Sequence, residues 1–197
     1  DNKMARLCAA QKALTFAVYR PTGYFYSKVL EDFYVDLAEK NKLSLENISY
    51  VHKSFLHVMT ECYSTGGHTR VVERWIEHAQ SDEKHSVVLL DQRDTELPRL
   101  LKNNIKKRNG ELFVLNKDKS QISRALDLRK LGMGYEYIIL HIHMDDPIST
   151  IAFGSKDFTR PVIFFNHAQH LFWIGKRISD IVADFMVGCN ISKERRL

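Results

Sequence analysis

The segment SFLHVMTECYSTGGHTRVVERWIEHAQ (residues 54–80) contains one complete strand, turn and helix, and the pattern that it sets recurs along the chain. Its first seven residues form an apolar run of the length of a buried strand. The glycines of STGG end this run, and apolar residues in the next stretch recur at helical spacing. The segment therefore predicts a β-strand at 54–60 followed by a helix at 68–80.

The same alternation continues to the carboxyl end. Further apolar runs predict strands at HSVVLLD (85–91), ELFVLN (111–116), YEYIILHIH (135–143), RPVIFFN (160–166) and DFMVGCN (184–190). Helices are predicted between them, at 95–108, 120–132, 147–155 and 170–183. Strands that alternate with helices pair in parallel through right-handed crossovers, and strands buried on both faces form continuous apolar runs. We therefore predict an α/β fold with a doubly wound, mainly parallel, Rossmann-like sheet of about six strands.

Residues 1–53 contain no such strand and are predicted to form a helical amino-terminal extension ahead of a Rossmann-like domain at 54–197. One apolar stripe is predicted from residues at four-residue spacing, namely Phe25, Val29, Phe33 and Leu37. An earlier helix would carry Leu7, Leu14 and Val18. We expect the aromatic stripe to dock on the main domain, and self-association or a membrane surface are the alternatives.

The composition fits a globular protein. The 197 residues are 44% hydrophobic, enough for one full core, and the net charge of +5 comes from basic residues mixed with acidic ones. We therefore expect ordinary solvated surface and no nucleic-acid partner. The three cysteines are widely spaced and suggest neither a zinc ribbon nor a disulfide framework, which favours a reducing, cytoplasmic setting. No apolar run reaches the roughly 18–20 residues that span a bilayer.

The motif HIHMDD ends the fourth predicted strand with two histidines and two acids. Residues two apart in a strand point the same way, so His141 and His143 would share a face. The pattern HxHxD resembles the zinc-binding HxHxDH motif of the metallo-β-lactamase superfamily, but here Asp146 stands at the last position. The favoured interpretation is a strand end at which Asp145 or Asp146 caps the next helix.

Two other junctions follow predicted strands, at the edge where such sheets bind ligands. Gly66 and Gly67 would let backbone N–H groups approach a phosphate or hydroxyl, and Arg70 could add a charged contact. The pair fits neither GxGxxG nor GxxxxGK[ST], so a nicotinamide or ATP site is not indicated, and a simple tight turn is the alternative. His167 and His170 could bind a sugar hydroxyl or transfer a proton, and we expect a role for at least one of them.

Three stretches together resemble one enzyme family. GGHTRVVERWI resembles the GGxxR loop and helix that open the amino-terminal domain of GT-B glycosyltransferases, and YEYIILHIHMDD is similar to their fourth strand. The stretch NHAQHLFW is similar to the NHADHLFW sequence of bacterial group 1 members, with Gln169 where they have Asp. The resemblance covers residues 54–190 and implies transfer of a sugar from a nucleotide-sugar donor to a glycan or lipid-linked acceptor.

By this resemblance the chain is the acceptor-side domain and needs no further cofactor or metal. Gly66, Gly67 and Arg70 would lie near the donor phosphates, and His167 would be the catalytic contact to the transferred sugar. Asn166 and His170 are further substrate-binding candidates. The carboxy-terminal donor domain of the family is not in the sequence, so we expect a piece of a longer enzyme that is inactive alone. The setting would be cytoplasmic or peripheral, at the inner face of the membrane.

Two other function classes remain open from the sequence. The first is a metal-dependent hydrolase that uses His141, His143 and Asp145, with His167 as a further ligand. The second is a non-enzymatic α/β module that assembles through its aromatic amino-terminal helices.

Overall fold

The computed structural model describes residues 3–20, 22–43, 48–93 and 96–184. In this part of the chain six parallel strands form one sheet, in the order β3-β2-β1-β4-β5-β6. The strands are β1 (Val51–Met59), β2 (Lys84–Leu89), β3 (Leu112–Val114), β4 (Tyr135–His141), β5 (Val162–Asn166) and β6 (Ile181–Asp184). The order reverses between β1 and β4, as in doubly wound Rossmann sheets. The predicted fold class is confirmed.

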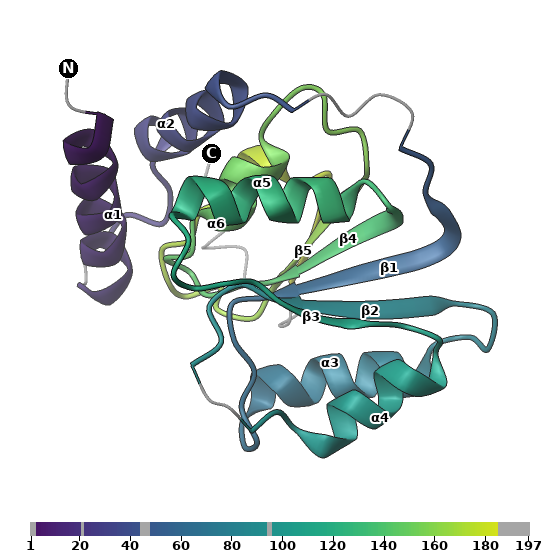
Figure 1. The fold of residues 1–197 in the computed structure, drawn as a ribbon. Helices are drawn as coiled ribbons and strands as arrows, with labels where there is room; N and C mark the ends of the chain where they lie inside the picture. The colour runs from purple at the N-terminus through teal and green to yellow at the C-terminus, as the bar shows by residue number, and fades with distance from the viewer. Residues whose placement is uncertain (1–2, 21, 44–47, 94–95, 185–197) are drawn as a thin grey trace.

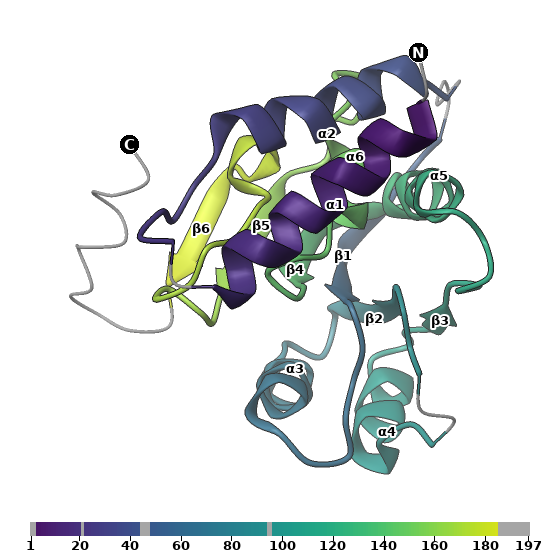
Figure 2. The ribbon, with the colours of Figure 1, turned by 90° about the vertical axis from the view of Figure 1, so that its left-hand side faces the viewer.

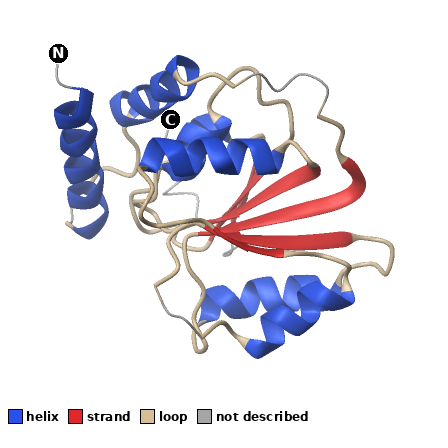
Figure 3. Cartoon of the chain, viewed as in Figure 1, coloured by secondary structure: helices blue, strands red, loops and turns tan. Residues whose placement is uncertain are grey.

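Helices cover both faces of the sheet, which lies as a single central layer (Figures 1 and 3). On one face lie α3 (Gly67–His78) and α4 (Arg99–Lys107). On the other lie α1 (Lys3–Tyr19), α2 (Lys28–Lys40), α5 (Gln121–Gly132) and α6 (Ile148–Phe153), and Figure 2 separates the two layers. Alternate residues of each strand serve the two faces: Leu56 and Val58 join the core with α1 and α5, and Met59 joins the core with α3.

The amino-terminal helices are part of the larger core. Leu7 and Leu14 of α1 and Tyr34 and Leu37 of α2 are buried in the same cluster as the sheet residues. The predicted four-residue stripe is wrong at its start, because Phe25 precedes α2 and Val29 is 78% exposed. A strict four-residue repeat turns by about 40° per step around a helix of 3.6 residues per turn, so one end of such a stripe leaves the buried face.

A buried carboxylate attaches α2 to the loop before β6. Glu31 Oε1 accepts hydrogen bonds from the backbone N–H groups of Gly175 (2.7 Å) and Lys176 (3.0 Å), and Oε2 accepts one from Arg177 (3.4 Å). Burial raises the pKa of Glu31, although these three bonds oppose the shift.

A buried guanidinium attaches α5 to the carboxyl ends of α2 and α6. Arg129 donates to the carbonyl oxygens of Ala152 (2.5 Å), Ile151 (2.7 Å), Asn41 (2.8 Å) and Ala38 (3.2 Å). Helix carboxyl ends leave carbonyl groups without partners inside the helix, and a cation there is also favoured by the helix dipole. One side chain thus joins three helices.

The predicted helix at 170–183 is wrong. Only a 3₁₀ turn, η1 (Lys176–Ile178), forms in this stretch, and β6 begins at Ile181. The backbone of Gly175 has a φ of 110°, which a helix does not allow, and Glu31 accepts from the N–H of Gly175 and from the next two N–H groups. The apolar residues before it are buried in a loop, where Trp173 stacks on Phe164. The predicted sixth strand at 184–190 lies outside the described residues, apart from its first position.

Replacing Arg129 with Met should lower the free energy of unfolding by about 3 kcal/mol or more, because several buried carbonyls lose their donor at about 1–3 kcal/mol each. Urea unfolding followed by circular dichroism measures this. The exposed neighbour Lys130 gives the matched control, since Lys130→Met should stay within about 0.5 kcal/mol of the wild type. Equal stability of the two variants would contradict the joining role of Arg129.

Candidate functional site

The carboxyl ends of β1, β2 and β4 meet at a cavity of about 210 Å³. The chain leaves β1 and β4 in opposite directions, and open α/β sheets bind ligands at such a switch point. Thr60 lines the cavity after β1, Asp91 after β2, and His143 and Asp146 after β4, while α1 and α5 supply its upper wall. A larger hollow of about 680 Å³ lies by the amino ends of β5 and β6, at the opposite edge from the predicted site.

Within the cavity, a hydroxyl and a carboxylate fix the HIHMDD turn. Thr60 Oγ1 donates to Asp146 Oδ2 (2.7 Å) and accepts from the backbone N–H of His143 (2.9 Å). Asp146 Oδ1 accepts from the N–H of Ile148 (2.9 Å), in the first turn of α6. The predicted capping role of an acid at this position is confirmed for Asp146. Burial raises the pKa of this carboxyl, and the bonds from Thr60 and Ile148 oppose the shift.

Three histidines form a hydrogen-bonded chain across the centre of the sheet, on the face that α3 covers. His57 Nε2 lies 2.9 Å from His85 Nδ1, and His57 Nδ1 lies 3.1 Å from His141 Nε2. All three side chains are buried. Desolvation lowers the pKa of each one, because burial disfavours the charged imidazolium. These rings are therefore neutral at pH 7.

A second group, the carboxyl-edge histidines His68, His143 and His167, continues from the end of this chain. The ring of His68 lies 4.3 Å from that of His167, 6.1 Å from that of His143 and 6.3 Å from that of His141, measured between centroids. Burial lowers the pKa of His68 to about 3 and also lowers that of His167. The predicted HIHMDD and FFNHAQH junctions thus meet, and the GGHTR junction joins them through His68.

Several ring nitrogens in this group are available to a ligand. In the described part of the chain, His68 Nε2, His141 Nδ1 and His167 Nδ1 are buried without a hydrogen-bond partner. Buried polar atoms are nearly always satisfied in folded proteins, by protein, ligand or water. Three such atoms on neighbouring rings are therefore candidate hydrogen-bonding groups for a polar ligand.

The Gly-Gly turn lies next to this group. Gly66 precedes α3 with a φ of 145°, a conformation that L side chains rarely adopt, and the space around both glycines is open within 4 Å of an added Cβ. The first turn of α3 is therefore accessible. Arg70 projects from the same turn, but its guanidinium pairs with Glu73 at 3.1 Å and is exposed.

The last two predicted site residues lie elsewhere. Asn166 is buried, where its Nδ2 donates to Asp184 Oδ1 (2.9 Å) and its Oδ1 accepts from the N–H of Ala168 (3.4 Å). His170 is exposed and lines a separate hollow of about 380 Å³, formed with the connection between α1 and α2. The structure therefore brings His167, Gly66 and Gly67 together, and leaves Asn166 and His170 outside the group.

Sequence reasoning missed His57, His68 and His85. His57 and His85 each stand in a predicted apolar strand, and this was the visible signal for both residues. His68 directly follows the Gly-Gly pair. What the sequence did not give was the strand register that brings these rings within bonding distance.

Across the described residues, no three His, Cys, Asp or Glu side chains are grouped as metal ligands would be. His141 Nε2 faces His57, and both oxygens of Asp146 accept protein hydrogen bonds. The metal-dependent hydrolase therefore remains a prediction without a ligand set.

Comparisons with protein-family models, curated proteins and solved structures found no match.

Proposed function

We propose that the chain is the acceptor-side domain of a GT-B glycosyltransferase that transfers a sugar from a nucleotide-sugar donor to a glycan or lipid-linked acceptor. The observation that carries the proposal is the pair of neutral imidazoles at the carboxyl edge, His68 and His167, beside an open Gly-Gly turn. One of these rings comes from each of the two stretches that most resemble the family: His68 from GGHTR and His167 from NHAQH.

The chemistry of these rings suits a sugar. A neutral imidazole has one donor and one acceptor nitrogen, and a sugar hydroxyl can pair with either. Burial keeps His68 and His167 uncharged, so they offer hydrogen bonds without attracting anions by net charge. Phosphates would instead use the accessible N–H groups at the start of α3, as the family resemblance implies for Gly66 and Gly67.

Residues 1–197 alone should bind nucleotide sugars weakly, because the family binds most of the donor with a second domain. Saccharide contacts should depend on His167. Isothermal calorimetry with UDP- and GDP-sugars, together with a glycan array, tests both statements. We expect His167→Ala to lower saccharide binding about tenfold or more, as for loss of a buried hydrogen bond with its partner left unpaired.

His78, exposed at the end of α3, gives the matched control, and His78→Ala should bind like the wild type. His170→Ala separates the two histidines of the NHAQH stretch and should have little effect. Tight nucleotide-sugar binding by the wild type, or equal saccharide binding by His167→Ala, would contradict the proposal.

A peripheral position at the inner face of a membrane is proposed for the same protein. The described part of the chain has no helix with the length and apolar character needed to cross a bilayer. Helix α1 instead exposes Met4 (69%) and Phe16 (61%), and it carries Lys3, Arg6 and Lys12 without any acidic residue. Exposed apolar side chains combined with basic ones favour the surface of an anionic bilayer.

Sedimentation with vesicles tests this position. The wild type should bind vesicles that contain phosphatidylglycerol and should bind less to pure phosphatidylcholine, with loss of binding in salt. The variant Lys12→Glu/Phe16→Ser should bind several-fold less, by about 1 kcal/mol per basic residue plus the lost apolar area. Lys107→Glu, on the opposite layer, is the control. Equal binding by both variants, or self-association through α1 in place of vesicle binding, would contradict it.

A further inference from the structure

The histidine chain begins at an acidic residue at the amino end of β2, away from the carboxyl edge of the sheet. His85 Nε2 lies 3.4 Å from Glu83 Oε2, just before β2, and His85 Nδ1 lies 2.9 Å from His57. His57 then reaches His141 at 3.1 Å. The contacts thus run from Glu83 at the amino end of β2 to His141 at the carboxyl end of β4.

The hydrogen bonds of this chain must all be donated in the same direction. A neutral imidazole carries one N–H and one lone pair, and an ionised carboxylate only accepts hydrogen bonds. Glu83 therefore requires the proton of His85 on Nε2, which leaves His85 Nδ1 as an acceptor. His57 must then donate from Nε2 and accept at Nδ1. By the same rule, His141 donates from Nε2, and its Nδ1 carries a lone pair.

We propose that Glu83 is a positioning residue that fixes the tautomers of His85, His57 and His141, and so presents His141 Nδ1 as a hydrogen-bond acceptor to a hydroxyl in the carboxyl-edge site. Only the identity of the ligand, a sugar hydroxyl, rests on the proposed function. The reverse tautomers would set the lone pair of His85 Nε2 against the carboxylate, and His141 would then present an N–H.

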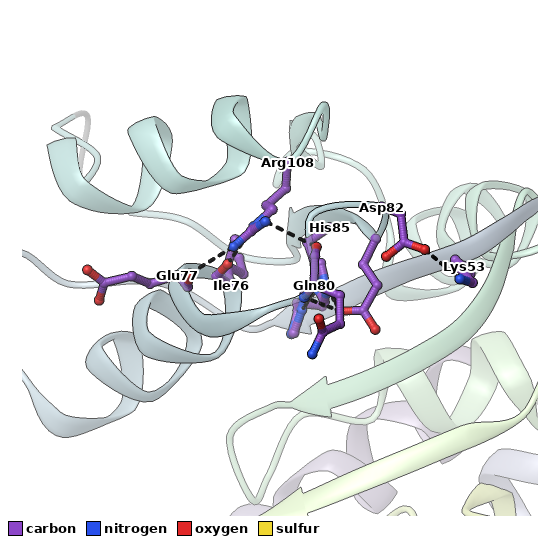
Figure 4. A network of polar contacts seen from close by, with 9 residues as sticks. Lys53, Ile76, Glu77, Gln80, Asp82, His85 and Arg108 are labelled. Carbon is purple, nitrogen blue, oxygen red and sulfur yellow. Dashed lines mark hydrogen bonds and ion pairs between the residues drawn. The ribbon is translucent and has the colours of Figure 1, made fainter.

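The turn that carries Glu83 is held in place by its neighbours, and Figure 4 shows Arg108 beside Ile76, Glu77 and Gln80. Glu83 Oε2 accepts from the backbone N–H of Gln80 (2.8 Å). Arg108, which ends α4, donates to the carbonyl oxygens of Ile76 (3.1 Å), Glu77 (2.9 Å) and Gln80 (3.1 Å). The turn that carries Glu83 is thereby attached to α3 and α4, and its carboxylate faces a ring that packs flat on Phe55 at 4.7 Å.

The other end of the chain lies next to His68 of the carboxyl-edge histidines. His141 Nδ1 is fully buried and has no partner among the described residues. The ring lies 5.5 Å from that of Phe165 and 6.3 Å from that of His68. A buried lone pair without a donor is costly, so a ligand that supplies a hydroxyl or N–H there is favoured over one that supplies only acceptors.

Nitrogen-15 NMR of the unliganded protein tests the proposal, because the protonated and unprotonated ring nitrogens give separate resonances. At pH 7.5 we expect His57, His85 and His141 all to carry the proton on Nε2, by about tenfold or more over the reverse tautomer. Glu83→Met removes the one oxygen, Oε2, that accepts from both the N–H of Gln80 and His85 Nε2, so the Nδ1-protonated form should appear in all three rings.

Glu77→Met gives the matched control, because Glu77 is exposed on α3 and its carboxylate pairs with Arg74. This variant should leave the three tautomers unchanged, and thermal melts should show that both variants fold. An Nδ1 proton on any of the three rings in the wild type would overturn the proposal, as would wild-type tautomers in Glu83→Met. Absence of saccharide binding by the wild type would contradict the proposed function. The role of Glu83 is tested separately, by the tautomers of the unliganded protein.

Discussion

The structure depends on a contact between uncharged imidazoles at the centre of the sheet. His57 lies on β1, between His85 of β2 and His141 of β4, and both of its ring nitrogens face a neighbouring ring. A proton on His57 would place a charge where water has no access, at a cost of several kcal/mol. The three central strands, which are paired through their backbones, thus also share side-chain hydrogen bonds between groups that must remain neutral.

This constraint also determines what the carboxyl edge can do. The chain ends at His141, and the rings of His68 and His167 follow at the position where doubly wound sheets bind ligands. Because the rings are neutral, the edge can pair with hydroxyl groups in either direction. Phosphates would bind separately, to the backbone N–H groups of the open turn before α3. The two features lie together, as the proposed transfer of a sugar from a nucleotide requires.

Much of the fold could be predicted from the sequence, since apolar runs alternate with helical periods and each strand from β1 to β5 overlaps its predicted run. The cap at Asp146 could also be predicted locally, because an acid just before a predicted helix commonly caps it. The helix expected at 170–183 could not be excluded locally, because Glu31, far away in the chain, binds the backbone of Gly175. The histidine chain depends on strand register, which periodicity alone does not give.

The pH dependence of stability tests the central claim most directly. A histidine with a folded-state pKa below its unfolded value of about 6.5 binds its proton mainly in the unfolded chain, so its contribution is complete above pH 6.5 and is lost as pH falls. Urea unfolding between pH 7.5 and 5 should show stability falling by up to about 1.4 kcal/mol per pH unit for each such histidine.

The same titration of His57→Leu isolates the chain, because Glu31 and Asp146 are common to both proteins. Its slope should be smaller than that of the wild type by about one histidine's contribution. Stability that stays constant or rises as the wild type is taken from pH 7.5 to 5, with the same slope in His57→Leu, would contradict the account.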